Sequence, residues 1–175
     1  MVGDRPDRFF TQHAQIRFSN RRCAAGNRGP HLTVEGDKFV IYLPEFDIPD
    51  FVLHEELVHL QRAIERAGHG PQGVAAYAAL VDNFEQIKQM LRTHGDNGLA
   101  QRAASQPTTR ARLDEAIRFL QYEVDEKLLT LEAARVRYAT RPTELAQIEQ
   151  VFEDSRLIYQ QQLDQLLAIR QLAGG

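Results

Sequence analysis

The residues best placed to do chemistry lie in one stretch, F-V-L-H-E-E-L-V-H-L-Q, at positions 51–61. His54 and His59 are five residues apart, so on a regular helix they point roughly 140° away from each other and could not share one ion. Glu55 and His59 are four residues apart and face the same way. A carboxylate and an imidazole on successive turns can converge on one metal ion.

This spacing predicts a metal site with a general base beside it. We expect His59 and Glu55 to be ligands for zinc, and a carboxylate ligand also admits Mn or Fe. Glu56 adjoins Glu55 and is the candidate catalytic base, since a carboxylate there can take a proton from metal-activated water. His54 is an alternative ligand if a local bulge brings it into line with His59.

Two further carboxylates follow in F-L-Q-Y-E-V-D-E-K-L-L-T-L-E-A, residues 119–133. Glu123 and Glu126 lie off the main apolar stripe of this helix, but apolar side chains surround them on the helical wheel. Burying a charge without a partner is costly, so these carboxylates need a cation. Because catalytic zinc takes three protein ligands and an open position, one of them is a candidate third ligand.

Both clusters also have an ordinary structural interpretation, in which the acidic residues form ion pairs and no metal binds. The first stretch would then be the solvated side of an amphipathic helix. The basic residues available as partners are Arg62, Arg66, Arg118 and Lys127.

The elements that must position these residues are a hairpin and about four helices. Residues 1–30 read as irregular, and H-L-T-V-E-G-D-K-F-V-I-Y-L-P at 31–44 predicts a β-hairpin around Glu35-Gly36-Asp37. The region 51–172 reads as helical. The predicted helices cover about 51–67, 71–94, 109–139 and Pro142 almost to the end, with a loop from Gly95 to about 108. We therefore expect one domain over 1–175, of the α+β class and mainly α.

Composition narrows the classes of partner. The chain of 175 residues has a net charge of −3, which argues against nucleic acid as a partner. The single cysteine, Cys23, cannot form an internal disulfide. No apolar run approaches a membrane span, and the first residues show no signal peptide, so we expect a protein that is cytoplasmic in the producing cell or delivered as a secreted effector.

L-H-E-E-L-V-H-L-Q after an apolar strand, with the helix Y-E-V-D-E-K some sixty residues later, resembles the zincin-like metallopeptidases, especially the compact toxin domains at the ends of bacterial secreted proteins. The similarity covers about residues 31–135. It implies that Glu56 is the general base, His59 the second histidine ligand and Glu55 the first ligand position. Glu123 or Glu126 would be the distal glutamate. The chain departs from the family because the first histidine is absent from its frame.

The resemblance also implies that T-V-E-G-D-K-F-V-I-Y-L is a substrate-binding strand, with Val40 and Ile41 in contact with an extended peptide. The predicted function is therefore a metal-dependent peptidase acting on a peptide or protein, without nucleic-acid or membrane partners. Two alternatives stay open. One is a carboxylate-bridged di-metal helical bundle, which would use Glu56-x-x-His59 and Glu123-x-x-Glu126. The other is a non-catalytic helical interaction module.

Overall fold

The computed structural model describes the backbone of residues 15–19, 31–35, 38–42, 50–68 and 70–174. Side chains are described for residues 58–60, 62–68, 72–150 and 152–174. The helices are α2 (Asp50–Ala67), α3 (Gly70–Ser105), α4 (Pro107–Arg137) and α5 (Pro142–Leu172). Within the described residues, no helix is long and apolar enough to cross a membrane.

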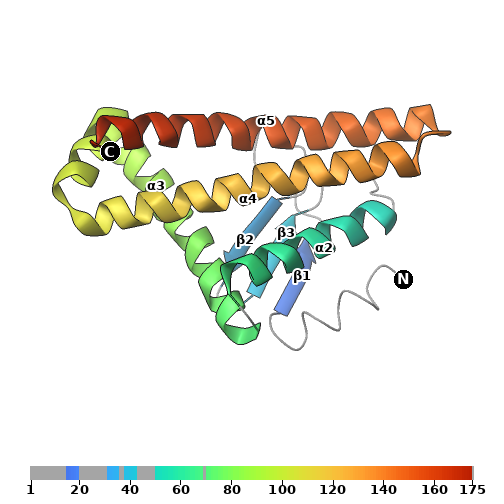
Figure 1. The fold of residues 1–175 in the computed structure, drawn as a ribbon, viewed down its shortest axis with the longest axis horizontal. Helices are drawn as coiled ribbons and strands as arrows, with labels where there is room; N and C mark the ends of the chain where they lie inside the picture. Colours follow the sequence, from blue (N-terminus) through green and yellow to red (C-terminus); the bar gives the residue numbers. More distant parts are fainter. Residues whose placement is uncertain (1–14, 20–30, 36–37, 43–49, 69, 175) are drawn as a thin grey trace.

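Helices α4 and α5 run side by side along the length of the molecule, as Figure 1 shows, with α3 and α2 packed against this pair. The main core contains fully buried Tyr77 and Leu80 from α3 and Leu113, Phe119 and Leu120 from α4. The apolar stripe predicted for the third helix is therefore confirmed as its buried face. Pro107 and Pro142 stand in the first turns of α4 and α5, where a missing backbone N–H costs little.

A second, smaller core lies farther along the α4–α5 pair. Leu131 and Ala134 of α4 pack there with Ile148 and Phe152 of α5. The segment joining the two helices adds Tyr138, which is 6% exposed. Two separate apolar clusters thus hold α4 against α5, and the polar residues discussed below lie between them along α4.

Three short strands precede the helices: β1 (Gln15–Ser19), β2 (His31–Glu35) and β3 (Lys38–Tyr42). Their order in the sheet is β1-β3-β2. β2 pairs antiparallel with β3, and β1 pairs parallel with β3. β1 falls within the stretch 1–30 that we predicted to be irregular.

The prediction of an α+β fold class built on an N-terminal β-hairpin is wrong, because the interpretable part of the chain is a helical bundle. Of the residues whose side chains are described, 93% are helical and none lies in a strand. The described core is built from helical residues and the turns that end them, so the helices alone make both clusters. Alternating apolar residues indicate a strand locally, but they do not decide which elements build the core.

The loop predicted from Gly95 to about 108 is also wrong, because α3 continues to Ser105. Gly95 interrupts it with φ 71° and ψ 178°, which produces a kink. Beyond the kink, Leu99 and Ala103 are almost fully buried, and their four-residue spacing keeps this segment helical against the core. The loop-forming residues of G-D-N-G indicate the kink correctly, but burial overrides their propensity.

Candidate functional site

His59 of α2 lies in a buried polar contact with α4. The residue is 3% exposed, and its Nδ1 is 2.6 Å from Oγ1 of Thr130, which is fully buried. The same hydroxyl donates to the backbone carbonyl of Glu126 at 3.2 Å. One arrangement satisfies both contacts: the hydroxyl donates to the carbonyl and accepts from an Nδ1–H of His59. In that tautomer the lone pair of the ring is on Nε2.

Glu126 is the second polar residue of this contact. It is 7% exposed, and its Oε2 lies 3.8 Å from Nδ1 of His59. Oε2 is buried and has no hydrogen-bond partner among the described residues. Its other oxygen, Oε1, is 3.7 Å from a guanidinium nitrogen of Arg66, whose side chain is largely exposed. Within the described part of the chain, one carboxylate oxygen is therefore withdrawn from water without a hydrogen bond in return, which is costly.

The pKa of His59 is lowered to about 3, first by burial and then by the positive charges of Lys127 and Arg62. The imidazole is therefore neutral near pH 7, and its contact with Glu126 is not an ion pair. Burial raises the pKa of Glu126, while Arg62 and Arg66 oppose that shift. The contact thus joins a neutral imidazole to a carboxyl with one unsatisfied oxygen, and either a proton or a bound cation would satisfy it.

Glu123 has a different environment from Glu126. The hydroxyl of Tyr77 on α3 donates to Oε1 of Glu123 at 2.9 Å. Tyr77 is fully buried, and burial followed by the charge of Glu123 raises its pKa well above the usual value. Because its carboxylate already accepts this bond, Glu123 has a structural role between α3 and α4. Glu126 is thus the better candidate for the distal glutamate.

Sequence reasoning missed Thr130 and Tyr77, and it placed Lys127 only as an ion-pair partner. Lys127 is 3% exposed, with its ammonium nitrogen 5.5 Å from the ring centre of Phe152. A signal for Thr130 was available, since it follows Glu126 by four residues and therefore lies on the same face of α4. No comparable signal pointed to Tyr77, whose position depends on the packing of α3.

The side chains of His54, Glu55 and Glu56 lie outside the described residues, but the backbone of α2 does not. α2 is helical from Asp50 to Ala67 without an internal break, so the spacing between Glu55 and His59 is that of a regular helix. The bulge that would bring His54 into line with His59 is not present in this backbone. Among the described residues no group of three or more His, Cys, Asp or Glu could hold a metal. His59 and Glu126 are thus two possible donors, and a metal site that used them would need a third donor from outside these residues.

The strand residues Val40 and Ile41 do not lie on a free edge. β3 is the central strand, in which Val40 pairs with Arg17 on one side and Thr33 on the other. An added peptide strand needs unpaired backbone groups at a sheet edge. In this pairing β3 offers no free edge to an added strand, and the role of Val40 and Ile41 in substrate binding stays a prediction.

Comparison of the chain with protein-family models, with curated proteins and with solved structures gave no match. The function of the protein is therefore inferred from the contacts of His59, Thr130 and Glu126. The resemblance to zincin-like domains adds the sequence context around them.

Proposed function

We propose that this protein is a metal-dependent peptidase of the zincin-like type. Zinc would be held by His59 and Glu55 of α2 and by Glu126 of α4, with Mn or Fe as alternatives. The observation that carries the proposal is the buried Oε2 of Glu126, which lies 3.8 Å from Nδ1 of His59 and has no hydrogen-bond partner among the side chains that the structure describes.

A cation explains this contact better than a protein partner does. Leaving a buried carboxylate oxygen unsatisfied costs on the order of 1–3 kcal/mol or more. Arg66 reaches the other oxygen at 3.7 Å, but its side chain is 46% exposed, so water screens the pair. Histidine binds metals in its neutral form, and burial keeps His59 neutral. His59 is therefore already in the protonation state that a metal requires. Glu126 must be ionised to act as a ligand, and burial opposes this by raising its pKa.

Each residue near the metal would have its own role in hydrolysis. A bound zinc ion supplies Lewis-acid chemistry and activates water. Glu56, next to Glu55 on α2, would take the proton of the attacking water. Thr130 holds the ring of His59 through Nδ1, and this contact favours the tautomer with its lone pair on Nε2. Because Oε2 of Glu126 lies 3.8 Å from Nδ1, the side chain of Glu126 would have to turn toward Nε2 to share the ion. The substrate would be a peptide or protein, and the resemblance suggests that the domain acts as a bacterial toxin or effector.

One observation favours a second function, a non-catalytic helical interaction module. His59, Thr130 and Lys127 are each at most 3% exposed, as expected for polar residues that specify helix packing. The di-metal bundle has less support, because Glu123 accepts its hydrogen bond from Tyr77. Measurements of zinc binding and of peptide hydrolysis would distinguish a peptidase from a non-catalytic interaction module.

The test is hydrolysis of fluorescently labelled casein by zinc-loaded protein. We expect activity that a chelator removes and that zinc restores. Glu56→Gln keeps the size of the side chain but cannot accept the proton, so turnover should fall by about 100-fold or more. Glu132→Gln, which neutralises an exposed glutamate of α4, is the matched control and should retain activity. Equal turnover in wild type and Glu56→Gln would remove Glu56 as the base, and a folded, zinc-loaded protein without activity would favour the module.

A further inference from the structure

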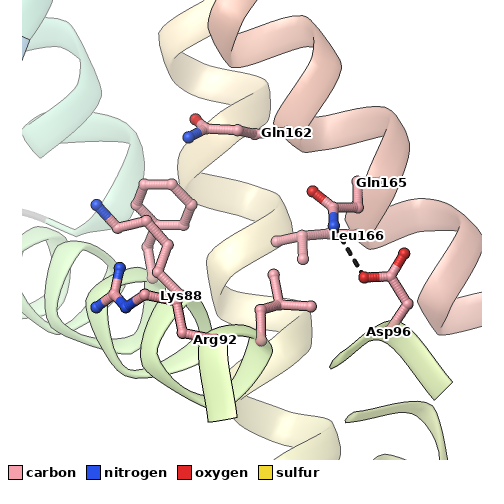
Figure 2. A pocket seen from close by; sticks show the side chains of 8 residues that line it. Lys88, Arg92, Asp96, Gln162, Gln165 and Leu166 are labelled. Atoms are coloured by element: carbon pink, nitrogen blue, oxygen red, sulfur yellow. Dashed lines mark hydrogen bonds between the residues drawn. The ribbon is translucent and has the colours of Figure 1, made fainter. Parts of the chain in front are cut away.

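A pocket of about 290 Å³ opens between α3 and α5, away from the contact of His59 with Thr130. Figure 2 shows that its basic side chains, Lys88 and Arg92, belong to α3 and that its amide side chains, Gln162 and Gln165, belong to α5. Phe84, Leu91 and Leu166 give it an apolar surface. This volume is slightly below the range of pockets that hold drug-sized ligands, so it suits a smaller molecule.

Two cations line the α3 side of the pocket. Lys88 and Arg92 are four residues apart, so they share one face of the helix. The ammonium nitrogen of Lys88 lies 2.7 Å from Oε1 of Glu85 and 4.7 Å from the ring centre of Phe84. Among the described residues, Arg92 has no hydrogen bond or ion pair. Its planar guanidinium is the donor group whose geometry matches a carboxylate.

The α5 side presents amides. Oε1 of Gln162 is buried and has no hydrogen-bond partner among the described residues. Nε2 of Gln165 donates to Oδ1 of Asp96 at 2.9 Å, the bond drawn in Figure 2. Asp96, the acidic residue of the pocket, therefore accepts one hydrogen bond at the rim, and a ligand carboxylate must lie away from it. Two polar groups that line the pocket have no partner in the part of the chain that the structure describes, the buried Oε1 of Gln162 and the exposed guanidinium of Arg92.

We propose that this pocket binds a small carboxylate that carries an apolar group and an N–H donor. The carboxylate pairs with Arg92, with Lys88 adding positive charge nearby. The N–H donor satisfies Oε1 of Gln162. The apolar group covers Phe84 and Leu166. The site is independent of the proposed metal centre, since none of its lining residues takes part in that centre.

The probe for this site is N-acetyl-L-leucine, which combines these three features in a molecule of suitable size. Binding is measured by titrating the full, isotope-labelled chain and following backbone amide resonances. We expect saturable shifts in residues 84–96 and 162–166, with a Kd on the order of 1 mM, as is usual for ligands with few atoms. N-acetyl-L-leucinamide has no charge and should bind about tenfold more weakly.

Two variants test the polar contacts directly. Arg92→Gln removes the charge from an exposed position, and Gln162→Met keeps the length of the side chain but removes the acceptor. Each should weaken binding of N-acetyl-L-leucine by about five- to tenfold. Arg135→Gln loses the same charge from the distal part of α4, where Arg135 lies 3.7 Å from Glu149, and should bind as wild type does. Circular dichroism spectra establish that all three variants fold.

Several results would overturn the proposal. Equal binding of the acid and the neutral amide would exclude recognition of a carboxylate. Undiminished binding by Arg92→Gln would exclude the assigned cation, and undiminished binding by Gln162→Met would exclude the assigned acceptor. Displacement of N-acetyl-L-leucine by inorganic phosphate of equal affinity would show a simple anion site instead. Absence of saturation at about tenfold above the expected Kd would exclude the site.

Discussion

Nδ1 of His59 on α2 lies 2.6 Å from the hydroxyl oxygen of Thr130 on α4, and both residues are buried. The contact joins two helices through polar atoms, so losing either partner leaves the other unsatisfied in the core. It also fixes the ring of the residue that we propose as a metal ligand. Contacts of this kind orient histidine ligands in metalloproteins.

The first prediction concerns this hydroxyl. Thr130→Val keeps the shape of the side chain but removes the partner of Nδ1, so the free energy of unfolding should fall by about 1–3 kcal/mol. Thr130→Ser keeps the hydroxyl and loses only a methyl group, which costs about 0.8 kcal/mol of transfer free energy. Urea unfolding of metal-free protein should therefore rank wild type above Thr130→Ser and Thr130→Val last. A valine variant as stable as wild type would show that the hydrogen bond contributes nothing.

The second prediction concerns the unsatisfied oxygen of Glu126. In metal-free protein, Glu126→Gln removes a buried charge without changing the size of the side chain, so the free energy of unfolding should rise by about 1 kcal/mol. Asp125→Asn is the control, because Asp125 lies 3.9 Å from the same Arg66 but is exposed. That change should stay within about 0.5 kcal/mol of wild type. A loss of stability in Glu126→Gln would mean that Arg66 already compensates the buried carboxylate.

The third prediction is that the ring of His59 does not titrate between pH 5 and pH 8. Burial, Lys127 and Arg62 lower its pKa from 6.5 to about 3. Between these values the unfolded chain binds a proton that the folded protein does not. The contribution of His59 to stability is therefore complete above pH 6.5 and falls as the pH decreases toward 3, by up to about 1.4 kcal/mol per pH unit. Imidazole resonances of metal-free protein measure the pKa directly, and a midpoint near 6.5 would refute the proposed environment.

The fourth prediction uses the kink in α3. In an ordinary helix, replacing glycine by alanine stabilises the protein, by roughly 0.5–1 kcal/mol. Gly95 has φ 71° and ψ 178°, a conformation that side chains rarely adopt. Gly95→Ala should therefore lower the free energy of unfolding, by about 1–3 kcal/mol. Increased thermal stability in this variant would indicate that α3 is continuous at this residue.

The sequence predicted the helices well because their signals are local. Pro142 and the periodic apolar residues fixed the start of α5, and the stripe containing Leu113 and Leu120 fixed the buried face of α4. The loop after Gly95 was wrong because a short-range turn signal competed with the burial of Leu99, which depends on the whole bundle. The predicted fold class was wrong for a similar reason, because strand propensity does not determine which elements form the core.

The candidate site could be predicted in part. Helical spacing selected His59 and the pair Glu123 and Glu126, but it could not choose between the two glutamates. The choice depends on Tyr77, whose hydroxyl bonds Glu123 and thereby sets it apart from Glu126. Thr130 was missed because threonine is common in helices. Its role is visible only from its contact with His59, which belongs to another helix. Such contacts between helices are tertiary information.

The central claim is that His59 and Glu126 hold one metal ion, and calorimetric titration of zinc into chelator-stripped protein tests it most directly. We predict one zinc ion per chain in wild type, and loss of that binding in both His59→Asn and Glu126→Gln. Asp125→Asn, which changes the neighbouring exposed carboxylate, should bind zinc as wild type does. Equal weak binding by wild type, His59→Asn and Glu126→Gln would contradict the claim and leave the buried contact as a structural link between α2 and α4.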